Sequence, residues 1–321
     1  MSTAARWPRC GRPLEERAVI PSASPPPSAP LSLSAWLALA QDQHADAPQA
    51  VADGLRQRAP TLPDDDDGAQ ALRLAEHLWL AHLADPAGLA ALLARLPAAV
   101  GLADGPVAPA LARIHWALAL LAGGPLPALG DAQRWRALQN VVLALARQGH
   151  ADRAERLLLA DEAAAALHGS SEAGRAYAAT ANNVAQDLSI GAGSDAGRDR
   201  LMLVAAALSL RAWSVAGTWL HHERAEYRLA LCHAALGQGD AALTHARRCL
   251  AACEAGNGRQ AADALEHFFA HEALALACRA AGDGPGRQAA VDGLHALLPA
   301  IDEAGGLRTW CVQVLHDLSA D

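Results

Sequence analysis

The 321-residue sequence contains no lysine, so arginine supplies all 26 of its basic side chains. With 34 acidic residues the formal net charge is −8, and the arginines are interspersed with aspartate and glutamate instead of forming a basic run. A surface that binds nucleic acid needs clustered positive charge to neutralise phosphates. We therefore do not expect a nucleic acid as the partner. The Ala-, Arg- and Gly-rich composition is typical of a GC-rich genome of the bacterial type.

Aromatic side chains are also scarce, at 4% of the chain, although hydrophobic residues make up 52%. Alanine and leucine supply most of the apolar surface, and both are strong helix formers. The β-branched and aromatic residues that favour strands are correspondingly few. The composition thus predicts an all-α protein.

The sequence does not indicate a membrane protein or a secreted protein. The most apolar N-terminal stretch, Leu31–Ala40, is too short to span a bilayer and lacks a positive segment immediately before it, so we expect a helix to start there. No C-x-x-C pair occurs among the six cysteines, which are Cys10, Cys232, Cys249, Cys253, Cys278 and Cys311. We interpret them as reduced, mostly buried thiols and expect a cytoplasmic protein with no membrane partner.

Changes in composition divide the chain into three parts. Residues 1–32 are rich in proline and serine and predict a disordered tail. Residues 33–130 show helical periodicity interrupted by Pro and Gly turns, and residues 131–321 predict a helical repeat domain. The acidic run Asp64–Asp67 is interpreted as a solvated turn whose last aspartate caps the next helix, with a cation site as the alternative.

A repeat emerges in the third part when its segments are aligned on a small residue in the first helix of each. These residues are Val142, Ala185, Ala230 and Ala277, separated by 43, 45 and 47 positions. Seven residues later come Gly149, Gly237 and Gly284, with Ala192 between two glycines in the remaining segment. Five residues further stand Ala154, Ala242 and Ala289. Small side chains at such positions allow two antiparallel helices to pack closely.

This pattern resembles the tetratricopeptide repeat (TPR), whose motif has a small residue in helix A, Gly at the turn and Ala in helix B. The best match is Tyr227–Ala242, and Thr180–Ala185 looks like the helix A opening of kinesin light chain repeats. The resemblance covers about residues 131–305, and the long period is similar to the long-repeat variety. It implies stacked antiparallel hairpins in a right-handed solenoid, with a concave groove that binds a peptide or partner protein without catalysis.

Polar residues in the first helices are the candidate binding residues. They are Asn140, Asn182, Asn183, Arg224, Tyr227 and Arg228. The resemblance implies that Asn140 and Asn183 hold the backbone of an extended peptide. The alternative is that these amides join adjacent repeats, since buried amides need partners in either case. The two arginines are candidates to meet a carboxylate, or they are solvated.

Two other readings of the repeat domain stay open. His222, Glu226, His267 and His271 have spacings that suit a zinc site, which would make the protein a metal-dependent enzyme or sensor. The second alternative is self-association, in which a second copy of the chain or the N-terminal tail fills the groove. Because no nucleophile elbow, phosphate loop or dinucleotide fingerprint occurs, we expect neither an enzyme nor a cofactor.

Overall fold

The computed structural model describes residues 31–98, 100, 105–256, 262–303 and 306–320, and in these residues it contains helices and no strand. The expected all-α class is therefore confirmed for the described chain. The predicted tail lies outside the described residues up to residue 30. Two compact units make up the structure, Met1–Ala112 and Arg113–Asp321. The composition had suggested a division at 130/131.

The first unit is a group of short helices around an apolar core. Its elements are α1 (Leu33–Gln43), α2 (Pro48–Arg58), the 3₁₀ turn η1 (Ala59–Thr61), α3 (Asp66–His77), the π-helical segment η2 (Leu78–His82) and α4 (Pro86–Leu93). Leu72, Leu78, Trp79, Leu80 and Leu89 are fully buried there. Helix α1 confirms the helix start expected at Leu31–Ala40.

The acidic run forms the turn before α3, but its capping residue differs from the expected one. Asp65, and not Asp67, is the N-cap, and its Oδ1 accepts the amide of Gly68 at 2.9 Å. Asp66 and Asp67 lie in the first turn, where the helix dipole favours negative charge. Asp64 accepts the amide of Val107 at 3.1 Å.

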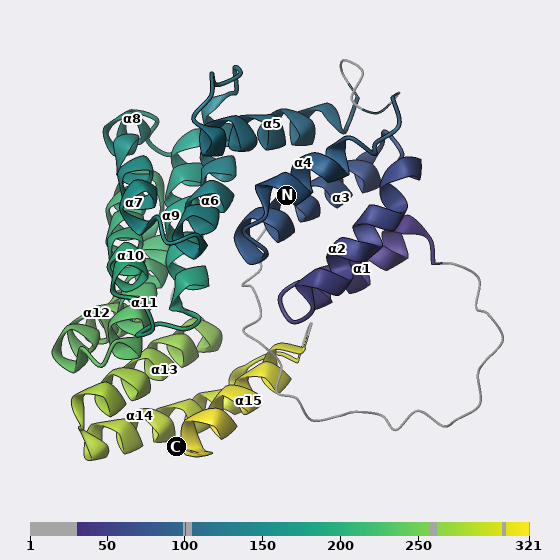
Figure 1. The fold of residues 1–321 in the computed structure, drawn as a ribbon. Coiled ribbons are helices and arrows are strands. Elements are labelled where there is room, and N and C mark those ends of the chain that lie inside the picture. The colour runs from purple at the N-terminus through teal and green to yellow at the C-terminus, as the bar shows by residue number, and fades with distance from the viewer. Residues whose placement is uncertain (1–30, 99, 101–104, 257–261, 304–305, 321) are drawn as a thin grey trace, which may run out of the picture. The chain divides into compact units, whose positions relative to one another are not determined.

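The second unit consists of paired helices. Its elements are α5 (Ala108–Ala122, which begins in the first unit), α6 (Asp131–Arg147), α7 (Ala151–Ala160), α8 (Glu162–Leu167), α9 (Glu172–Ser189), α10 (Ala196–Ala216), α11 (Trp219–Ala235), α12 (Gly239–Ala255), α13 (Ala264–Ala281), α14 (Gly284–Leu297), η3 (Leu298–Ala300) and α15 (Leu307–Ala320). Helices α6/α7, α9/α10, α11/α12 and α13/α14 pack as hairpins (Figure 1). Each first helix also contacts the next one: α6 meets α9, α9 meets α11, and α11 meets α13.

Small residues lie at the helix contacts, as the alignment predicted. Val142, Ala185, Ala230 and Ala277 are each 0% exposed. Gly149 and Gly237 end α6 and α11 with φ of +80° and +67°, a left-handed conformation that glycine adopts without a steric penalty. The first and third hairpins therefore turn where the sequence indicated.

The fourth hairpin corrects the alignment. Its left-handed turn glycine is Gly282, with φ of +71°, whereas Gly284 is the first residue of α14. Asp283 caps α14 by accepting the amide of Gly286 at 2.9 Å, and this cap sets where the helix starts. Ala289, the expected close-contact residue, is exposed in this hairpin, whereas the neighbouring Ala290 is buried.

Two further expectations from the sequence concern the state of the cysteines and the presence of membrane-spanning helices. The five described cysteines, which do not include Cys10, are buried and unpaired by disulfides, as expected for packed thiols. In the described part of the chain, no helix combines the length and apolar character needed to cross a bilayer.

Candidate functional site

Three amide side chains form a row across α6 and α9. Asn183 donates from Nδ2 to Oε1 of Gln139, 44 residues earlier, at 3.0 Å, and accepts from Nδ2 of Asn182 at 3.5 Å. All three residues are half-buried. The row thus joins the two neighbouring first helices, α6 and α9, and is partly exposed to solvent.

The amide row keeps hydrogen-bonding capacity beyond its own contacts. Each amide group has two N–H donors and an oxygen with two lone pairs. Asn183 uses one donor and one lone pair inside the row, and Asn182 uses one donor. An extended peptide backbone presents the complementary N–H and C=O groups. The row can therefore serve both as a tie between helices and as a binding surface.

Other candidate binding residues lie in the interior. Asn140 is 4% exposed, and Arg228 is equally buried. Arg228 donates from Nη2 to Oε1 of Gln186 in α9 at 2.7 Å, and Tyr227 donates from Oη to Oε2 of Glu272 in α13 at 2.9 Å. These contacts join α11 to the first helix on either side. Arg228 is therefore not the solvated residue that the sequence left as an alternative.

Arg224 is half-buried and already holds a carboxylate of the chain. Its guanidinium makes a bidentate ion pair with Glu266 of α13. Nε donates to Oε2 at 3.2 Å, and Nη2 donates to Oε1. Such a bidentate pair has a fixed geometry. A partner's carboxylate would have to compete with Glu266 for this arginine.

Buried carboxyl groups accompany these ties. Burial raises the pKa of Glu272 to about 7, although the Tyr227 hydroxyl and the charge of Arg228 act in the opposite direction. Burial likewise raises the pKa of Glu223, which accepts the Cys249 thiol at 2.8 Å. Removing a carboxylate from water disfavours its charged form. We therefore expect the Glu272 carboxyl to change its charge near neutral pH.

The fold does not bring the candidate histidine and glutamate ligands of the second unit together as a metal site. Nε2 of His222 lies 3.8 Å from Oε1 of Glu226, whose other oxygen is 2.6 Å from Nδ1 of His245. His267 bonds through Nδ1 to the carbonyl of Asp263 at 3.0 Å. Among the described residues, one group of three possible metal ligands lies close enough together to hold an ion. That group contains none of these histidines and does not contain His271.

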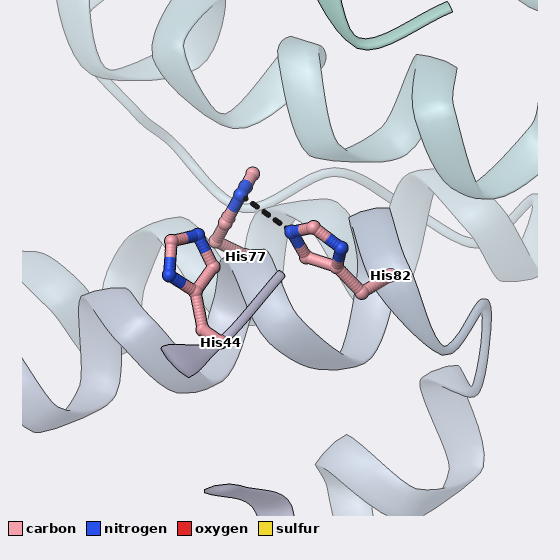
Figure 2. A group of neighbouring side chains, drawn as sticks. All are labelled: His44, His77 and His82. Atoms are coloured by element: carbon pink, nitrogen blue, oxygen red, sulfur yellow. Dashed lines mark hydrogen bonds between the residues drawn. The ribbon is translucent and has the colours of Figure 1, made fainter. Parts of the chain in front are cut away.

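The converging set lies in the first unit instead and consists of His44, His77 and His82 (Figure 2). One nitrogen of each ring lies within 4.8 Å of the others. Sequence reasoning missed this group because His77 and His82 are five residues apart, which places them on different faces of a regular α-helix. Only a π-helical turn, which the sequence did not signal, aligns them.

A shallow apolar pocket is another surface feature of the second unit. It lies at α10, α11 and α12 and is lined by Leu203, Val204, Ala207, Leu210, Arg211, Leu229, His233 and His245. Apolar concavities with a few polar groups are typical of binding sites. This pocket is therefore the rival location for a partner.

Comparison of the chain with protein-family models, curated proteins and solved structures gives no match. The likeness to tetratricopeptide repeats accordingly stays a resemblance of sequence motifs. Function must be inferred from the residues and contacts of the chain itself.

Proposed function

We propose that residues 131–305 form a TPR-like right-handed solenoid and that the protein is a non-enzymatic binding module for an extended peptide or a peptide-like segment of a partner protein. The partner's backbone lies across the first helices, along the row made by Gln139, Asn182 and Asn183. The observation that carries this proposal is the half-buried position of the row, with donors and an acceptor left for a ligand.

The spacing of the inter-helix bonds supports a repeating array. Side chains separated by 42 to 45 positions bond one first helix to the next at Arg228–Gln186, Asn183–Gln139 and Tyr227–Glu272. Each separation is close to one repeat length, so the bonds link each first helix to the first helix of the next hairpin. A hairpin that cannot bury its apolar face alone is stabilised by such stacking.

The chemistry of the row favours a backbone ligand over a charged one. Amides pair with both N–H and C=O groups and carry no charge, so they recognise a peptide main chain of any sequence. The nearest candidate cations for an acidic ligand, Arg224 and Arg228, are engaged by Glu266 and Gln186. We therefore expect side-chain specificity to come from residues flanking the row.

Peptides selected for binding to the full chain from a displayed library test the proposal. We expect Asn183→Ala to weaken a selected peptide about tenfold, because losing one or two net hydrogen bonds costs on the order of 1–1.5 kcal/mol. Titration calorimetry measures the affinity. Because Asn183 is only half-buried, the melting temperature should change by no more than a few degrees.

The matched control is Gln288→Ala in α14. Gln288 is exposed and, like Asn183, makes a single side-chain bond as donor, to Oδ1 of Asp292 at 2.9 Å. Its loss should leave peptide affinity unchanged. If no peptide can be selected, or if the selected peptides bind the Asn183 variant as tightly as the native chain, the proposed function is wrong.

A further inference from the structure

The three histidines of the first unit come from separate elements that the fold brings to one place. His44 is the C-cap residue of α1, His77 ends α3, and His82 ends the π-helical segment. Each is half-buried. We propose that His44, His77 and His82 bind one Zn²⁺ ion through their imidazole nitrogens, with a fourth position open to water or a small anion.

The π-helical turn is what brings His77 and His82 together. In an α-helix, residues five apart differ by about 140° around the axis, since each residue turns about 100°. Here the amide of Leu83 donates to the carbonyl of Leu78 at 3.0 Å, five residues back, so the turn takes up one extra residue. Single π turns inside helices are rare and are frequent at functional sites.

The distances between the rings suit a shared ion. Ligands about 2.0–2.1 Å from a tetrahedral zinc lie about 3.3 Å from one another. Nε2 of His77 and Nε2 of His82 are 3.1 Å apart, joined by the dashed line in Figure 2. The centroid of the His44 ring lies 5.4 Å and 5.2 Å from those of His77 and His82, with interplanar angles of 62° and 88°. One nitrogen of each ring lies within 4.8 Å of the others, so the side chains need to close in on the ion when it binds.

A backbone contact prepares His44 as a ligand. Its Nδ1 lies 2.7 Å from the carbonyl oxygen of Gln41. A carbonyl only accepts, so Nδ1 carries the hydrogen and Nε2 keeps its lone pair. Metal-binding histidines commonly donate their second ring nitrogen to a backbone carbonyl in this way, which fixes both the tautomer and the ring orientation.

The segment that carries His77 and His82 is held firmly. Of the four residues between them, Leu78, Trp79 and Leu80 are each 0% exposed and Ala81 is 3% exposed. Buried neighbours fix the backbone, and a site on a fixed element loses less freedom when it binds an ion. The π turn is therefore a packed feature of the core.

The ligand set selects the kind of metal. Three neutral imidazoles suit Zn²⁺ and related transition ions, whereas Mg²⁺ and Ca²⁺ prefer oxygen ligands. Structural zinc sites use four protein ligands, while sites with three keep a position for water or substrate. The converging group holds three. The proposed site is therefore of the open type.

Metal titration of the full-length chain, after treatment with a chelator, tests the proposal. We expect one Zn²⁺ per chain by titration calorimetry, and the visible absorption of a tetrahedral nitrogen site with Co²⁺ as the probe. Added azide should change the Co²⁺ absorption, and an unchanged spectrum would overturn the open fourth position. Failure of the native chain to take up either metal overturns the site itself.

Variants separate this site from other histidines. His82→Phe keeps a ring for the edge-to-face packing but removes a ligand, so we expect at least about a 100-fold weaker affinity with an unchanged apo melting temperature. His77→Ala and His44→Ala should have the same effect on affinity. The exposed His316→Ala, and His222→Ala together with His267→Ala from the repeat domain, should bind zinc as the native chain does. Uptake that survives His82→Phe, or that is lost in the repeat-domain variants, contradicts the proposal.

Discussion

Replacing Ala242 by leucine should lower the free energy of unfolding by about 3 kcal/mol, because three extra carbon atoms have no space at this contact. Ala242 is 0% exposed in α12, which packs against α11 on one side and α13 on the other. Overfilling it forces the helices of the third hairpin apart. The melting temperature should fall by roughly 6–10 °C. Urea unfolding followed by circular dichroism measures the change.

The matched control for Ala242→Leu is the same substitution at Ala289. The sequence alignment gives these alanines equivalent positions, yet Ala289 is exposed in α14. Ala289→Leu should therefore change the stability by no more than about 0.5 kcal/mol. Equal destabilisation by both substitutions would show that the fourth hairpin follows the sequence alignment and not the observed helix start.

Replacing Glu272 by glutamine should remove a pH dependence of stability worth roughly 3–4 kcal/mol. The pKa of this carboxyl is about 7 in the folded chain, raised by burial from an ordinary value of 4.5. Between these values the folded chain holds a proton that the unfolded chain has released, so stability falls as pH rises. The stabilising contribution is complete below pH 4.5 and is lost above about pH 7. Each unit of pKa shift corresponds to about 1.4 kcal/mol.

Glutamine has no such proton, and its oxygen still accepts the Tyr227 hydroxyl that Glu272 accepts at 2.9 Å. From pH 4.5 to 8, the unfolding free energy of Glu272→Gln should therefore rise relative to that of the native chain. Urea titrations across this range measure it. The control is Glu303→Gln, which changes an exposed carboxyl that accepts the Thr309 hydroxyl at 2.8 Å. A Glu272→Gln curve parallel to that of the native chain would show that the carboxyl is ionised in the fold.

Much of the helical framework could be predicted from the sequence, because it depends on local signals. Alanine and leucine content predicted helices, and the small residues at Val142, Ala185, Ala230 and Ala277 predicted buried contacts. The fourth turn was placed wrongly because the segment contains three glycines at alternate positions, Gly282, Gly284 and Gly286. Only the cap made by Asp283 decides which of them takes the left-handed conformation.

The candidate sites were less predictable, because they depend on contacts between distant residues. The sequence marked Asn183 as a candidate binding residue, but it did not show that the amide bonds Gln139. Helical spacing directed attention to His267 and His271, which do not join a ligand group among the described residues. The histidines that do converge depend on a π turn and on the fold placing His44 beside α3, and neither is a property of local spacing.

Photo-crosslinking of a selected peptide to the native chain locates the proposed binding surface. With a photoreactive group on the peptide, mass spectrometry identifies the residues of the chain that react. We expect crosslinks in α6 and α9 beside Gln139, Asn182 and Asn183. Crosslinks confined to the apolar pocket at α10–α12, around Leu210 and His245, would contradict this expectation.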